Sequence, residues 1–104
     1  MDYSIENMNK TSKGTLMEVL GIEYIIVEPG FVKAKMPVDE RTKQPFGILH
    51  GGASVALAET IGSIGSAVIV NDENADVRGA GVSANHVKAV KSGWVYAEAR
   101  TIHV

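Results

Sequence analysis

The feature that most limits how this chain folds is an apolar run of 18 residues, from Ala53 to Val70. The run holds one ionisable side chain, Glu59. It is too long for one ordinary strand, so it predicts a single helix over residues 52–70, about 28 Å long. Its many small residues let other backbones come close, which favours a helix covered on nearly every side.

A membrane-spanning role for this run is an alternative that its polar residues oppose. A run of 18 apolar residues is just long enough to cross a bilayer. However, a carboxylate at the bilayer centre costs at least a few kcal/mol, and Gly, Ser and Thr also interrupt the run. The first ten residues, MDYSIENMNK, lack the basic stretch and apolar core of a signal peptide. We therefore expect a cytoplasmic protein without membrane contact.

Charge and cysteine content argue against two classes of function. The 104 residues include 10 Lys and Arg and 12 Asp and Glu, which gives a net charge of −2. Nothing in this balance attracts nucleic acid. The chain has no cysteine, and no spacing of His, Asp and Glu suggests a metal site. We expect no metal and no cofactor, and the length predicts one domain over residues 1–104.

The segments around the predicted helix are typical of β-strands. On its N-terminal side, after short helical pieces within residues 4–20, IEYIIV and the alternating FVKAKMPV are joined by a turn at Pro29 and Gly30. Two more strands are expected over residues 77–90 and 94–104. This order predicts an α+β fold in which an antiparallel sheet wraps around one long central helix.

Glu59 is the residue that the predicted helix explains least. A buried ionised carboxylate without a partner costs several kcal/mol. No Lys, Arg or His lies within one helical turn of it, and Ser63 is its only neighbour four residues away that can form a hydrogen bond. Either Glu59 lies on a narrow exposed strip of the helix, or it faces a polar cleft in which it has a function.

The HGG sequence at residues 50–52 favours a function. Backbone N–H groups at a helix start, together with the positive end of the helix dipole, stabilise a developing oxyanion. Seven residues separate Gly52 from Glu59, so both lie on one face, about 10 Å apart along the axis. Gln44 adds an amide from the preceding loop. A substrate between the helix start and the carboxylate would be polarised at one end and attacked at the other.

The string MPVDERTKQPFGILHGGASVALAETIGSIGS closely resembles hotdog-fold acyl-CoA thioesterases of the phenylacetic-acid-degradation type. The nearest branch is that of the 1,4-dihydroxy-2-naphthoyl-CoA thioesterases. SANHVKAVKSGWVYAEA continues the resemblance, which covers nearly the whole chain. It implies hydrolysis of an acyl-CoA or aroyl-CoA thioester. It also implies a homodimer or homotetramer, because members of this family have their active sites between subunits.

The resemblance also implies roles for particular residues. Glu59 would act as the nucleophile or as a general base toward water, and the Gly51 N–H would hold the thioester oxygen. Gln44 and His50 would orient the carbonyl or the water, and Ser63 would hydrogen-bond the carboxylate or the water. Substrate and coenzyme A would be held by a later strand, through Gly79, His86, Val87, Lys88 and Ala89.

Simpler roles and other functions stay open at this point. His50 is also an ordinary loop or capping residue, and Ser63 is also a helix serine bonded to its own backbone. The chain could be a non-catalytic acyl-CoA-binding module or an inactive relative. It could also be a hotdog dehydratase acting on 3-hydroxyacyl thioesters. A dehydratase usually pairs a catalytic histidine with a carboxylate, and the glycines after His50 fit a hydrolase better.

The sequence departs from the family pattern at its end. Family members usually continue past TIHV with a turn that contains glycine and arginine, followed by two more strands. A shortened sheet would leave strand edges and part of the helix uncovered. This departure favours an intertwined oligomer, in which copies of the chain exchange strands.

Overall fold

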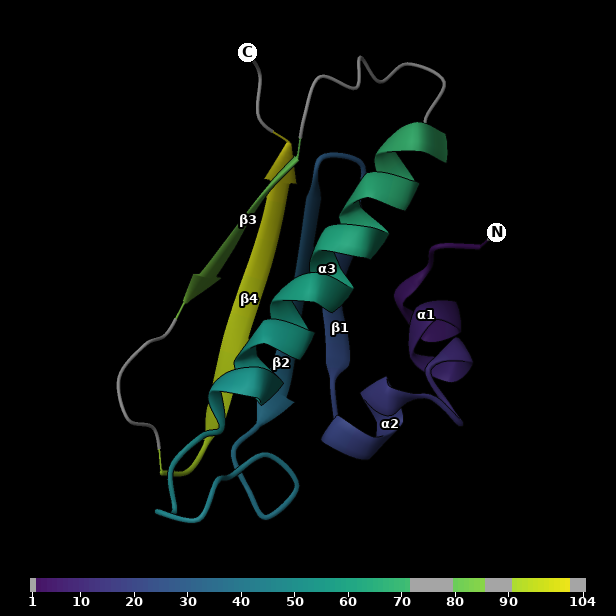
Figure 1. Ribbon diagram of the computed structural model, residues 1–104. Helices are drawn as coiled ribbons and strands as arrows, with labels where there is room; N and C mark the ends of the chain where they lie inside the picture. Colours follow the sequence, from purple (N-terminus) through teal and green to yellow (C-terminus); the bar gives the residue numbers. More distant parts are fainter. Residues whose placement is uncertain (1, 72–79, 86–90, 102–104) are drawn as a thin grey trace.

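The structure is a computed structural model that describes residues 2–71, 80–85 and 91–101. A long helix lies across one face of a sheet, and two short helices lie beside it (Figure 1). This arrangement confirms the predicted α+β architecture. In chain order, the elements are α1 (Ile5–Thr11), α2 (Leu16–Leu20), β1 (Glu23–Glu28), β2 (Phe31–Pro37), α3 (Gly51–Asn71), β3 (Ala80–Asn85) and β4 (Trp94–Thr101).

The sheet is antiparallel throughout its described strands, in the order β1-β2-β4-β3. The two central strands, β2 and β4, pair small residues on the face toward α3, so that Val32 lies opposite Ala99 and Ala34 opposite Ala97. All four side chains are buried. These short side chains let α3 approach the sheet closely. At Gly65 of α3, an added Cβ would lie only 3.3 Å from the Ala99 Cβ.

The helix α3 begins and ends within one residue of the predicted bounds, but the expectation that it is covered on nearly every side is wrong for this chain. Its buried residues recur every three or four positions, which makes a single stripe against the sheet. One sheet covers only one face of a helix, so the opposite face, which carries Val55, Glu59 and Ser63, is exposed. None of the helices in the described part of the chain is long and apolar enough to cross a membrane.

The two short N-terminal helices are held in place by caps and by one side chain. Ser4 and Thr15 cap α1 and α2, because their side-chain oxygens accept hydrogen bonds from backbone N–H groups of the first turn. Gly21, with a φ of 75°, ends α2 and leads into β1. Asn9 of α1 accepts a hydrogen bond from the Tyr24 N–H of β1 at 2.9 Å. This bond therefore holds α1 against β1.

Candidate active site

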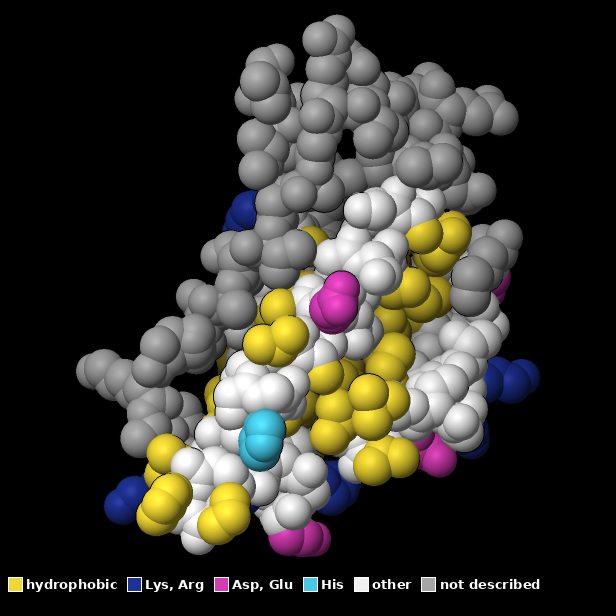
Figure 2. Space-filling model, viewed as in Figure 1, with side chains coloured by type: hydrophobic (Ala, Val, Ile, Leu, Met, Phe, Trp, Pro, Cys, Tyr) yellow, Lys and Arg dark blue, Asp and Glu magenta, His cyan; other side chains and the backbone are white. Residues whose placement is uncertain are grey.

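A surface hollow of about 350 Å³ contains Glu59. On this face of the molecule, hydrophobic side chains gather between α3 and the N-terminal helices, with an acidic and a histidine side chain among them (Figure 2). Glu59 is exposed, and it lines this shallow, open hollow. The hollow is lined by residues of α2, β1 and α3, namely Met17, Tyr24, Glu59, Thr60, Ser63 and Ile64.

The Glu59 carboxylate has no hydrogen bond or ion pair with any other residue that the structure describes. Ser63 lies one helical turn further along, in the same hollow. Thr60 lies between them, but its hydroxyl donates to the Ala56 carbonyl at 2.8 Å and is occupied. Glu59 and Ser63 therefore line the same hollow without a hydrogen bond between them, and the carboxylate is available to a substrate or a water molecule.

His50 caps the start of α3. Its carbonyl accepts hydrogen bonds from the N–H groups of Ala53 and Ser54, at 3.0 and 3.3 Å. Its ring Nδ1 accepts a further hydrogen bond from the Gly52 N–H at 2.7 Å. Because Nδ1 accepts, the ring proton of neutral His50 is on Nε2. The Gly51 N–H, in contrast, makes no hydrogen bond with a described residue.

The two glycines at the helix start differ in the space around them. A Cβ at Gly52 would lie 2.8 Å from the His50 Cε1, so a larger residue there would displace the imidazole from its place over the helix start. A Cβ at Gly51 would meet no described atom within 4 Å. Packing against the described residues therefore does not explain Gly51. Its open surroundings leave the N–H accessible to an oxygen from outside the chain.

Gln44 lies in a tight loop that leads to the helix start. Its backbone N–H donates to the Ile48 carbonyl at 2.8 Å, and its side-chain Oε1 accepts from the Phe46 N–H. The side-chain NH2 group makes no hydrogen bond with a described residue. Gln44 can therefore still donate hydrogen bonds to a carbonyl or a water molecule.

Thr42 is a positioning residue that the sequence did not reveal. It is 1% exposed, and its hydroxyl donates to the Pro37 carbonyl at 2.7 Å. Its own carbonyl accepts from the His50 N–H at 2.8 Å. These two bonds connect the end of β2 to the start of α3. A threonine within the polar string DERTKQ gives no signal that it would be buried.

A second hollow, of about 270 Å³, lies at the helix start and contains His50 and Gly52. Arg41 borders it and pairs with Asp39 at 2.6 Å. This hydrogen-bonded pair lowers the pKa of Asp39 and raises that of Arg41. Glu59 does not line this hollow. Among the described residues, the helix start and the carboxylate therefore line two different hollows.

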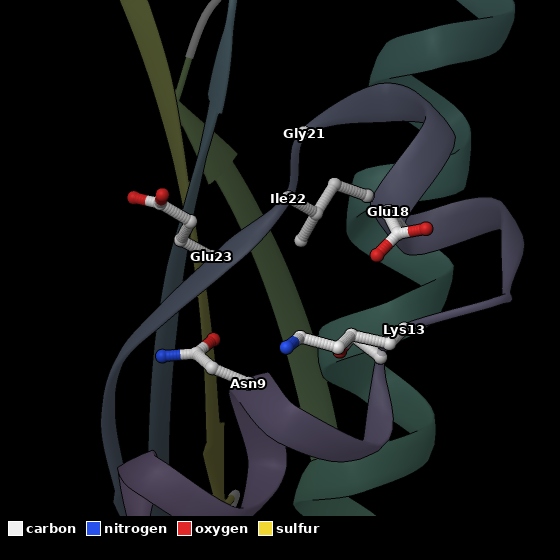
Figure 3. Close-up of a pocket in the computed structure, with 7 residues that line it drawn as sticks. Asn9, Lys13, Glu18, Gly21, Ile22 and Glu23 are labelled. Carbon is white, nitrogen blue, oxygen red and sulfur yellow. The ribbon is translucent and has the colours of Figure 1, made fainter.

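A third hollow, of about 280 Å³, lies between α1, α2 and the start of β1. The Lys13 side chain extends into it, across from Asn9 (Figure 3). It contains none of the predicted site residues. The predicted residues Gly79, His86, Val87, Lys88 and Ala89 lie outside the described part of the chain. Within that part, no group of three or more His, Cys, Asp or Glu residues could hold a metal ion.

Comparison with known proteins shows the family of this chain. Residues 46–104 match the model of the thioesterase superfamily. The proofreading thioesterase EntH of Cronobacter turicensis is 48% identical over 101 residues, which cover 97% of this chain and 73% of that protein. The chain therefore belongs to the thioesterase superfamily, and it is a thioester hydrolase.

Solved structures agree with this family and its fold. Thioesterase HI1161 from Haemophilus influenzae superimposes with a TM-score of 0.77 at 39% identity, over all of this chain and 72% of that one. A mutant of thioesterase PA1618 from Pseudomonas aeruginosa gives a TM-score of 0.76 at 38% identity, over all of this chain and 75% of that one. The predicted hotdog fold, a sheet around a central helix, is confirmed.

Proposed function

We propose that this protein hydrolyses an acyl-CoA or aroyl-CoA thioester to the free acid and coenzyme A, with Glu59 as the catalytic carboxylate. The supporting observation is that Glu59 lies in a mainly apolar hollow and has no partner among the described residues. An unpaired carboxylate beside an apolar wall can attack a carbonyl directly or take a proton from a water molecule. Both roles for Glu59 remain part of the proposal.

The start of α3 would stabilise the oxyanion. The Gly51 N–H points from the positive end of the helix dipole and has no described acceptor. His50 would help by keeping the Gly52 N–H occupied, since that leaves Gly51 as the free donor at this position. Gln44 would orient the carbonyl or the water through its side-chain NH2 group. Ser63 would hydrogen-bond the carboxylate or the water that it activates.

Geometry favours an active site made from two copies of the chain. Gly51 and Glu59 are eight residues apart on one helix, which is about 12 Å along its axis. A carbonyl that is attacked from about 3 Å, and whose oxygen accepts a hydrogen bond at about 3 Å, spans roughly half of that distance. We therefore assign Glu59 of one copy and Gly51 of a second copy to the same thioester, in a homodimer or homotetramer.

Mass in solution, measured together with thiol release from acetyl-, hexanoyl- and benzoyl-CoA, tests this function. We expect an oligomer that releases one thiol for each acid formed. Binding of benzoyl-CoA without thiol release would instead support the non-catalytic module. Hydration of crotonyl-CoA without thiol release would support the dehydratase.

Other parts of the sequence-based account stay predictions. They are the cytoplasmic location, the single domain over residues 1–104, the strand-exchanged assembly and the 1,4-dihydroxy-2-naphthoyl-CoA branch. The binding of substrate and coenzyme A by Gly79 and residues 86–89 also stays a prediction. The working hypothesis requires no cofactor, because a carboxylate and backbone donors are sufficient for thioester hydrolysis.

A further inference from the structure

We propose that Met17 of α2 limits the size of the acyl group that this thioesterase accepts. The inference rests on the proposed function, because it places the acyl group next to Glu59. Met17 and Glu59 line the same hollow, although β1 and β2 separate α2 from α3 in the sequence. Met17 is therefore the residue of the N-terminal helices that an acyl chain would contact as it extends away from Glu59.

The hollow can receive a compact acyl group. When the thioester carbonyl is at Glu59, the carbons that follow it extend along the wall formed by Met17, Tyr24 and Ile64. The hollow measures about 350 Å³. For comparison, an apolar cavity of about 150 Å³ holds one benzene molecule. A single ring or a short chain therefore fits, whereas a longer chain would contact Met17.

Two hydroxyl groups hold the Met17 side chain in place. Its sulfur accepts a hydrogen bond from the Tyr24 hydroxyl at 3.7 Å. It also contacts the Ser12 hydroxyl oxygen at 3.7 Å, while the Ser12 proton is donated to the Met8 carbonyl at 3.0 Å. Tyr24 is 4% exposed, and burial raises the pKa of its hydroxyl to about 12, so it remains a donor at neutral pH. Methionine is otherwise an adaptable side chain. These contacts make it a fixed wall, which can set a size limit.

The Met17 side chain can be replaced by a smaller or larger one without disrupting the main hydrophobic core. The helix α2 has five residues, none of them fully buried, and Met17 only borders the hydrophobic core. Its α2 neighbour Val19 is 62% exposed and lines neither the Glu59 hollow nor the one at the helix start. Val19 therefore offers a matched control on the same helix.

The test is a chain-length series of acyl-CoA substrates, from acetyl to decanoyl, with kcat/KM measured for each. We expect Met17→Ala to raise the ratio of octanoyl to butyryl hydrolysis by about tenfold, because the wall recedes. Met17→Phe should lower the same ratio by about tenfold. Acetyl-CoA is too short to reach the wall and should change by less than about threefold. Val19→Ala should keep the wild-type profile.

Parallel chain-length profiles for wild type, Met17→Ala and Met17→Phe would overturn the role of Met17, even if the enzyme is active. If wild type releases no thiol from any substrate, the proposed function fails instead. In that case, binding of S-alkyl-CoA thioethers of the same lengths, measured by calorimetry, gives a separate result. A shift toward longer thioethers in Met17→Ala would still support the size limit. Equal preferences, or no binding, would overturn it.

Discussion

Replacing Glu59 with Gln is expected to lower kcat for thioester hydrolysis by about 10³-fold. The amide has nearly the same shape, but it can neither attack the carbonyl nor take a proton from water. Thiol release from the best CoA substrate of the wild type gives the measurement. Glu59→Ala should cause a loss of similar size.

These substitutions should have little effect on the stability of the folded protein. Glu59 is exposed and has no ion pair with the described residues, so the free energy of unfolding should change by less than about 0.5 kcal/mol. Glu6, which is exposed on α1 and outside all three hollows, provides the matched control, and Glu6→Gln should keep full activity. Wild-type turnover in Glu59→Gln would end the assignment of Glu59.

Gly51→Pro is expected to lower kcat by about 10²- to 10³-fold, because proline has no N–H to donate to the oxyanion. Gly51 is the first residue of α3, where proline fits the helix and removes no intrahelical hydrogen bond. The substitution therefore tests the N–H group with little effect on the helix. The measurement is kcat for thiol release, alongside a thermal unfolding curve.

Gly51→Ala is the control for this experiment. Alanine keeps the N–H group, and its Cβ would meet no described atom within 4 Å. We expect it to retain at least about a tenth of wild-type kcat, well above Gly51→Pro. If both variants lose activity equally, crowding rather than the missing donor is responsible, and the oxyanion role of Gly51 is wrong.

The long helix and its place in an α+β fold could be predicted because an 18-residue apolar run allows few other structures. The exposure of Glu59 could not be predicted from the sequence. Small residues occur on all sides of α3, so they do not show which face of the helix the sheet covers. The pairing of Met17 with Glu59 in one hollow is also absent from the sequence. It depends on how α2 packs beside α3, and no local pattern records that packing.

The start of the helix was partly predictable. The HGG sequence indicated a helix N-terminus with free donors, and the structure has α3 beginning at Gly51. It did not indicate that the His50 ring accepts the Gly52 N–H, nor that buried Thr42 holds the loop. Both features depend on contacts between the loop, β2 and α3.

Mixed oligomers of Glu59→Ala and Gly51→Pro chains show whether Glu59 and Gly51 act from different copies of the chain. If Glu59 and Gly51 act from different copies, a dimer with one chain of each kind has one intact site and one site that lacks both groups. Random mixing of equal amounts should then restore about a quarter of wild-type thiol release. Activity that stays at the average of the two parent variants would contradict a site shared between copies.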